Sequence, residues 1–108
     1  MTTKLPDPVA AYYAAEQADD AEALSRCFTP EAIVRDEGAT RHGRAEIAAW
    51  MAEAKHRYRH HTEVLAATPA GNAVTVSVRV SGRFPNSPVV LTQVFTLADG
   101  AIQTLETA

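Results

Sequence analysis

The sequence predicts an α+β fold in which helices pack on a strongly curved, mainly antiparallel sheet. Residues 44–57 repeat apolar side chains at helical spacing, most clearly at Ile47 and Trp50. Residues 73–84 instead alternate valine with polar residues, which is typical of a strand with one dry face. A wide apolar helix stripe must lie against an apolar surface, and a sheet is the simplest partner.

Size and composition predict one globular domain over residues 1–108. A chain of 108 residues closes around a single core, and 46% hydrophobic with 21% charged residues is ordinary for such a domain. The net charge of -3, with acids and bases mixed, argues against a nucleic acid or an anionic membrane as partner. Cys27 is the only cysteine, so an internal disulfide is excluded and a reducing compartment is expected.

Targeting segments and common catalytic fingerprints are absent from the sequence. The stretch from Met1 to Val9 lacks an apolar signal core, and no run approaches the roughly 18 apolar residues that span a bilayer. A cytoplasmic location without membrane contact is therefore expected. No phosphate-binding glycine loop, nucleophile elbow or dinucleotide fingerprint supports phosphoryl transfer, serine hydrolysis or hydride transfer, and no cofactor is expected.

Two short helices and a strand are predicted before residue 37. The Asp7-Pro8 pair is typical of an N-cap followed by proline at the first helical position, and a helix is expected over residues 8–18. A second helix is expected over residues 20–28. The Thr29-Pro30-Glu31 stretch then predicts a turn before a strand over residues 32–36.

The rest of the chain is predicted to hold one long helix and then a meander of strands. After a brief strand, the helix is expected over residues 44–57. The later strands are expected over residues 62–67, 73–84, 89–97 and 101–107, with turns between them. Both faces of residues 89–97 are apolar enough to be covered, so either protein lies on both faces or the outer face forms a homodimer surface.

The predicted strand over residues 32–36 places an acid where a pocket is expected. Val34 and Asp36 share a face because side chains alternate along a strand. If Val34 faces the core, Asp36 faces it too, and a carboxylate there costs free energy unless it is hydrogen-bonded or solvated. A curved sheet leaves a cavity between its concave face and the helices. The alternative is that Asp36 closes a turn near Gly38.

The chain resembles the NTF2-like superfamily, and within it the SnoaL-like polyketide cyclase and ketosteroid isomerase branches. The resemblance extends from Val9 to Glu106. The stretches that carry it are Phe28-Thr29-Pro30-Glu31-Ala32, Val34-Arg35-Asp36 and Gly43-Arg44-Ala45-Glu46-Ile47. It implies the cystatin-like cone of that superfamily, with three N-terminal helices on the sheet, and a small hydrophobic or carbonyl-containing ligand. The superfamily holds enzymes, ligand binders and structural dimers, so fold alone does not decide the activity.

The isomerase pattern, carried over residue by residue, implies catalytic roles for Asp36 and Tyr12. In that family an aspartate moves a proton beside a carbonyl group, while a tyrosine hydrogen-bonds the enolate oxygen. Positions 12 and 36 are 24 apart (36 − 12), as in the family. The family's second donor is an acid, and the matching position here is Gln93, whose neutral amide stabilises an oxyanion less. Tyr12 as a core residue is the alternative.

The expected pocket wall combines aromatic and aliphatic side chains with a few polar groups. The residues expected to contact the ligand are Phe28, Val34, Trp50, Tyr58, Val78, Leu91, Gln93, Phe95 and Glu106. For Trp50 and Tyr58 the alternative is packing of the helix on the sheet. Glu106 shares a predicted strand face with Ile102, and its alternative is an exposed terminal acid.

Three histidines close the long predicted helix and raise the question of a metal site. His56 and His60 are four residues apart and share a helix face, with His61 nearby. The neighbouring cations are Lys55, Arg57 and Arg59. Because these charges repel a metal ion, no metal is predicted, and a solvated basic helix end is the better interpretation. The alternative is that one histidine enters the cavity and shares a proton with Asp36.

Together these patterns predict a protein with a small-molecule pocket. The first hypothesis is cofactor-free acid-base catalysis on an enolisable carbonyl compound, either an isomerisation or an aldol-type cyclisation, with Asp36 as the base. The alternative is a non-catalytic ligand-binding or dimerisation module of the same fold.

Overall fold

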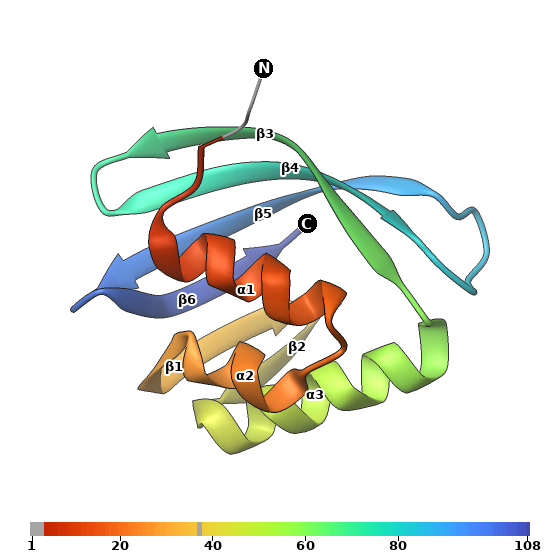
Figure 1. The fold of residues 1–108 in the computed structure, drawn as a ribbon, viewed down its shortest axis with the longest axis horizontal. Coiled ribbons are helices and arrows are strands. Elements are labelled where there is room, and N and C mark those ends of the chain that lie inside the picture. The colour runs from red at the N-terminus through yellow and green to blue at the C-terminus, as the bar shows by residue number, and fades with distance from the viewer. Residues whose placement is uncertain (1–3, 37) are drawn as a thin grey trace.

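The computed structural model describes residues 4–36 and 38–108 (Figure 1). The first three residues of the Met1 to Val9 stretch therefore lie outside the described residues. The elements are α1 (Asp7–Gln17), α2 (Ala21–Arg26), β1 (Phe28–Asp36), β2 (Ala39–His42), α3 (Gly43–Tyr58), β3 (His61–Ala70), β4 (Ala73–Ser81), β5 (Val89–Ala98) and β6 (Ala101–Thr107). Over the described ranges this is the predicted α+β combination of helices and a six-stranded sheet.

The six strands found in the described residues form one sheet in the order β2-β1-β6-β5-β4-β3. Neighbouring strands are antiparallel except β1 and β6, which are parallel, so the sheet is mainly antiparallel as predicted. Figure 1 shows the long strands β3, β4 and β5 arching over α1, while α2 and α3 lie beside β1 and β2. The helices and the concave face of the sheet therefore enclose the interior.

The predicted placement of the helices and one predicted turn are wrong. The three helices of the described chain are not all N-terminal, because α3 follows β1 and β2. The Thr29-Pro30-Glu31 stretch is part of β1 rather than a turn, and α2 ends at Arg26. The pairing of β1 with β6 shifts register between Phe28 and Ile33. Pro30 has no N–H to donate, and this interruption of the ladder accommodates it.

The ends of α3 determine where the chain enters and leaves the helix. The backbone N–H of His42 donates to Glu46 Oε1 at 2.8 Å, so the side chain satisfies a donor before the first turn. At the other end Arg59 adopts a left-handed conformation with φ of 48°, and its N–H donates to the Lys55 carbonyl at 2.9 Å. The chain then turns back into β3, which brings His60 against the last turn of α3.

The core lies between α1, α2, the start of α3 and the inner face of the sheet. Its fully buried side chains include Val9, Leu24, Phe28, Val34, Ile47, Val76, Val78, Phe95, Ile102 and Leu105. The valines of β4 point inward, as the alternating pattern predicts. Tyr12 packs edge-on against Phe28 and Phe95, with ring centroids 5.9 and 5.3 Å apart. Among the described residues no helix is long and apolar enough to cross a membrane.

Candidate functional site

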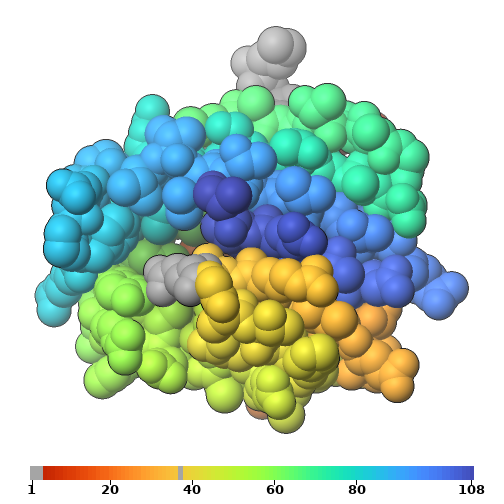
Figure 2. Space-filling view, turned by 180° about the vertical axis from the view of Figure 1, so that it is seen from behind, coloured from red at the N-terminus to blue at the C-terminus, as the bar shows by residue number. Residues whose placement is uncertain are grey.

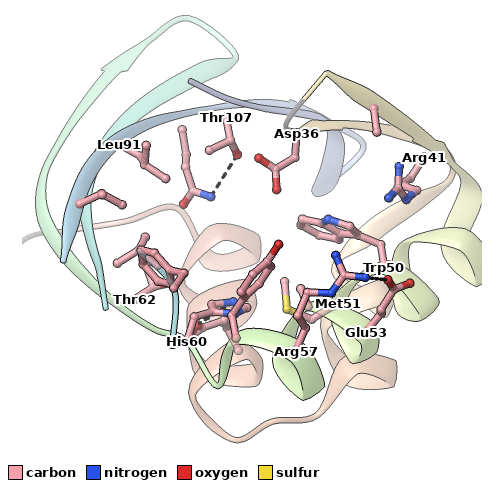
Figure 3. A pocket seen from close by; sticks show the side chains of 18 of the residues that line it. Asp36, Arg41, Trp50, Met51, Glu53, Arg57, His60, Thr62, Leu91 and Thr107 are labelled. Carbon is pink, nitrogen blue, oxygen red and sulfur yellow. Dashed lines mark hydrogen bonds and ion pairs between the residues drawn. The ribbon is translucent and has the colours of Figure 1, made fainter. Parts of the chain in front are cut away.

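A cavity of about 600 Å³ opens between the concave face of the sheet and the helices α1 and α3 (Figure 3). Apolar side chains form most of its wall, namely Trp50, Met51, Tyr58, Val80, Phe84, Val89 and Leu91. Polar groups reach the wall at a few points, among them Asp36, Arg41, Arg57, His60 and Gln93. This size and this mixture of surfaces are typical of a site for a small organic molecule.

Asp36 lies at the end of β1, and its carboxylate points into the cavity above Trp50 and Arg57 (Figure 3). Val34, two residues earlier, is fully buried, so the alternation of β1 turns both side chains inward as the sequence predicts. Tyr12 lines the same cavity from α1. The structure therefore brings the two residues at positions 12 and 36 to the wall of one cavity.

The phenol of Tyr12 stays protonated in this environment. Burial raises the pKa of Tyr12 well above its usual range, and the neighbouring Tyr13, Glu16 and Asp36 raise it further. The Gln93 side chain lowers this pKa, but the overall shift remains upward. Because the hydroxyl keeps its proton at neutral pH, Tyr12 presents an O–H donor at the cavity wall.

Gln93 is buried on β5, and two hydrogen bonds fix its amide. The hydroxyl of Tyr13 donates to Gln93 Oε1 at 2.6 Å. Gln93 Nε2 donates to Thr107 Oγ1 at 3.3 Å, and Figure 3 marks this second bond by the dashed line at Thr107. Burial, followed by the charge of Glu16, raises the pKa of Tyr13, so this tyrosine also remains a donor. The amide nitrogen of Gln93 therefore lies on the side of Thr107, another residue of the cavity wall.

The other expected contact residues divide between the cavity and the core. Trp50, Tyr58 and Leu91 line the cavity. Phe28, Val34, Val78 and Phe95 are fully buried in the core and are not part of its wall. The alternating pattern predicts that these side chains face inward. It does not predict where along each strand the helices move away from the sheet.

Glu106 points away from the cavity, contrary to the inward face expected for it. Its carboxylate lies 3.1 Å from Arg35 Nη1 on the exposed side of the sheet. The pairing of β5 with β6 shifts register between Thr96 and Leu97, and the alternation along β6 changes with it. As a result Leu105 is buried, and Thr107 takes the inward place beside the cavity.

A buried ion pair at the cavity is a feature that the sequence reasoning missed. Glu16 of α1 is only 2% exposed and lines the cavity. Its Oε2 lies 3.3 Å from Lys55 Nζ and 4.0 Å from His60 Nε2. Lys55 Nζ also lies 3.2 Å from Asp19 Oδ1 and donates to the His60 carbonyl at 2.6 Å. These contacts join α1, α3 and the start of β3.

The pattern that indicates this ion pair is present in the sequence. Glu16 stands seven residues after Val9 (16 − 9), on the buried stripe of α1. Lys55 stands eight residues after Ile47 (55 − 47), on the buried stripe of α3. An acid and a base on the two stripes that face the interior are expected to pair, because an unpaired buried charge costs several kcal/mol.

His60 is the histidine that reaches the cavity, and its acidic neighbour is Glu16 rather than Asp36. Burial lowers the pKa of His60, and the charge of Lys55 lowers it further. The imidazole is therefore neutral at pH 7. His56 and His61 are exposed. Within residues 4–36 and 38–108, no group of three or more His, Cys, Asp or Glu side chains is arranged to hold a metal ion.

Fold and cavity together define an α+β cone with a small-molecule pocket. The family model for the SnoaL-like domain matches residues 9–104, and the chain therefore belongs to the SnoaL-like family of the NTF2-like superfamily. No match is found among the curated protein sequences.

Solved structures support the same assignment. A candidate polyketide cyclase from Sinorhizobium meliloti is 44% identical, with 96% of this chain and 95% of that chain covered and a TM-score of 0.94. A protein with a ketosteroid isomerase-like fold from Catenulispora acidiphila, in complex with trimethylamine, is 24% identical, with 99% and 86% covered and a TM-score of 0.86. An epoxide hydrolase/cyclase-like enzyme of pyran ring formation in salinomycin is 22% identical, with 94% and 86% covered and a TM-score of 0.80. The last two show the likeness of fold alone.

Proposed function

We propose that the protein binds a small carbonyl compound in the cavity and transfers a proton on it without a cofactor. The reaction is either an isomerisation or an aldol-type cyclisation. The observation that carries this proposal is that Asp36 and Tyr12 line one largely apolar cavity of about 600 Å³. The 44% identical structure of a candidate polyketide cyclase supports carbonyl chemistry in this branch of the family.

Asp36 is the base in this proposal. Its carboxylate removes a proton from the carbon next to the carbonyl group, and the electron pair of the C–H bond moves to form an enolate. In an isomerisation Asp36 returns the proton to another carbon of the enolate. In a cyclisation the enolate carbon attacks a second carbonyl group of the same molecule, and the new alkoxide takes up the proton.

Tyr12 and Gln93 stabilise the enolate oxygen in this scheme. Tyr12 keeps its hydroxyl proton because burial raises its pKa, so it can donate a hydrogen bond as negative charge develops. The Gln93 amide is held by Tyr13 and Thr107, which limits the loss of side-chain freedom on binding. As a neutral donor it stabilises the oxyanion less than a carboxylic acid would, so a modest rate is expected.

The test is hydrogen exchange on an enolisable ketone. Cyclohexanone is incubated with the protein in heavy water, and deuterium at the carbons next to the carbonyl is followed by mass spectrometry. Asp36→Asn keeps the shape of the side chain but removes the base, so protein-dependent exchange is expected to fall about 100-fold or more. Glu106→Gln, on the exposed side of the sheet, is the matched control and is expected to leave exchange unchanged. Equal exchange in wild type and Asp36→Asn would refute the proposal.

The alternative function is a non-catalytic ligand-binding or dimerisation module. The presence of Gln93 in place of an acid favours it, because the second donor to the oxyanion is weakened. This alternative predicts that ketones bind in the cavity but exchange no faster than in buffer.

A further inference from the structure

The cavity wall contains a cationic side chain that the proposed proton transfer does not use, Arg41 of β2. Arg41 lies opposite Val34 in the pairing of β2 with β1, and Val34 is fully buried on the inner face of the sheet. Directly opposed residues of an antiparallel pair point to the same face, so Arg41 points inward as well. Arg41 is half-buried and lines the cavity (Figure 3). It is therefore within reach of a ligand.

The other charged side chains of the wall already have a partner or a role. Within the described residues these side chains are Glu16, Asp36, Glu53 and Arg57. Glu16 Oε2 lies 3.3 Å from Lys55 Nζ, and Arg57 Nη2 lies 3.1 Å from Glu53 Oε1. Asp36 is the base of the proposed reaction. Residues 4–36 and 38–108 provide no ion pair for Arg41. Arg41 is thus the cation of this wall that is open to an anionic group of a ligand.

The surroundings of Arg41 favour a carboxylate. The planar guanidinium group binds the two oxygens of a carboxylate through parallel hydrogen bonds. The largely apolar cavity wall reduces screening by water, so such a pair is stronger here than on an open surface. A phosphate group also fits a guanidinium group, but it brings a second negative charge into a cavity that already contains Asp36. The remaining guanidinium group of the wall, that of Arg57, already faces Glu53.

The register of β1 and β2 places Arg41 near the proposed base. Asp36 lies opposite Ala39, and Arg41 follows Ala39 by two residues (41 − 39) on the same face of β2. Such diagonal neighbours on a sheet are about 7–8 Å apart. A carboxylate held by Arg41 therefore belongs to the same ligand as the carbon that approaches Asp36. The charge of Arg41 also offsets the repulsion between that carboxylate and Asp36.

We infer that Arg41 forms a second subsite of the cavity and binds a carboxylate group of the ligand. This inference deepens the proposed function and rests on it for the position of the carbonyl group. It specifies the substrate class as keto acids, which carry both a carbonyl group and a carboxylate, rather than uncharged ketones.

Ligand binding can be followed through Trp50. It is the single tryptophan of the chain and lines the cavity, so its fluorescence reports on the occupied site. Wild-type protein at pH 7 and low salt is titrated with 4-oxocyclohexanecarboxylate, with its uncharged methyl ester and with cyclohexanone. The carboxylate is expected to bind about tenfold more tightly than either of the others, because hydrogen bonds between charged groups are strong. Equal affinities for the three compounds would overturn the inference.

Variants assign the preference to Arg41. Arg41→Gln and Arg41→Met remove the charge and keep a side chain of moderate length, and each is expected to reduce the tenfold preference to about twofold or less. Arg41 stands on the edge strand β2 and is half-buried, and either variant that folds decides the question. An undiminished preference in a folded Arg41 variant would overturn the inference.

Arg35→Gln is the matched control for charge. Arg35 stands on the neighbouring strand β1, but its side chain is exposed on the other face of the sheet, where it pairs with Glu106. The change removes the same charge from the protein without touching the cavity, so the preference for the carboxylate is expected to stay. An equal loss in Arg35→Gln and Arg41→Gln would overturn the inference, since the preference would then come from the overall charge.

The exchange and binding experiments fail separately. Cyclohexanone has no carboxylate, so exchange on this ketone tests Asp36 without involving Arg41. Exchange that does not depend on Asp36, together with a retained preference for the carboxylate, refutes the proposed reaction and leaves the subsite. Exchange that depends on Asp36 without such a preference does the opposite.

Discussion

The interior of the molecule has a tightly packed end and a hollow end, and the same helices and strands contribute to both. The packed end, defined here by Phe28, Val34, Phe95 and Leu105, contains fully buried side chains. The hollow end, defined by Asp36, Trp50, Tyr58 and Leu91, surrounds the cavity. Along β5 the two ends share one face of the strand, yet Phe95 is enclosed and Leu91 borders open space. The face of a strand therefore decides which residues point inward, and the distance to the helices decides whether they meet protein or ligand.

Aromatic rings close the packed end. Tyr12 and Tyr13 of α1 lie edge-on against Phe95, with centroids 5.3 and 5.8 Å away, and these rings fill the space between helix and sheet. Polar contacts hold the elements together at the hollow end instead, above all the contacts of Lys55 with Glu16 and the His60 carbonyl. Figure 3 shows His60 at this end. The packed end should therefore depend on close packing, and the hollow end on charge pairing.

The largest effect is expected from Lys55→Met. The change removes the ammonium group beside Glu16, whose side chain is 2% exposed, and leaves a buried carboxylate without its ion pair. Removing one partner of a buried pair typically lowers the free energy of unfolding by about 3–5 kcal/mol. Urea denaturation at pH 7 measures the loss.

The double variant Lys55→Met with Glu16→Gln is the control for charge. It removes both ions, so it is expected to regain at least about half of the stability lost in the single variant. A loss below about 1 kcal/mol in Lys55→Met would show that charge pairing is unimportant at the hollow end.

A matched pair of leucines compares the two ends directly. Leu105 is fully buried at the packed end, and its replacement by alanine is expected to lower the free energy of unfolding by about 2–5 kcal/mol. Leu91 borders the cavity and is partly exposed, so Leu91→Ala creates little new void and is expected to cost about 1 kcal/mol. Denaturation of the two variants without ligand gives the comparison. Equal losses would contradict the distinction between the ends.

The inward faces could be predicted from the sequence because alternation is a local property. Val34 with Asp36, and the valines of β4, follow from side-chain geometry within one strand. Glu106 could not be placed in this way, since its face depends on a register shift in the pairing with β5. The conformation at Pro30 could not be predicted from the sequence either. A proline fits a turn and an interrupted strand pairing equally well, and only the pairing of β1 with β6 distinguishes the two.

The cavity itself could be predicted only in outline. A curved sheet over helices implies a hollow, but its extent is set by how far α3 runs before Arg59 turns the chain into β3. The Glu16 and Lys55 pair was within reach of the sequence, because both residues stand on buried helix stripes. The pattern of either helix alone shows only one charged residue on a buried stripe, and the pair follows only when the stripes of α1 and α3 are considered together.

The smallest expected effect is the pH dependence that His60 gives to the hollow end. Burial and Lys55 lower the pKa of His60, His61 lowers it further, and Glu16 with the Ala54 backbone opposes them. In the unfolded chain this pKa lies near its ordinary value of 6.5. As the pH falls below that value the unfolded state takes up the proton first, so the folded protein loses stability until the lowered pKa of the folded state is passed.

His60→Gln removes this titration and leaves the other histidines in place. Between about pH 7.5 and pH 5 the free energy of unfolding of the wild type is therefore expected to fall more steeply than that of His60→Gln. Urea denaturation of both proteins at several pH values measures the difference, in which the contributions of the remaining titrating groups cancel. A constant difference would mean that His60 titrates alike in the folded and unfolded chain. If the wild type instead gains stability relative to His60→Gln at low pH, the effect of Glu16 on the His60 pKa outweighs the effects of burial and Lys55. The hollow end would then stabilise the imidazolium instead of excluding it.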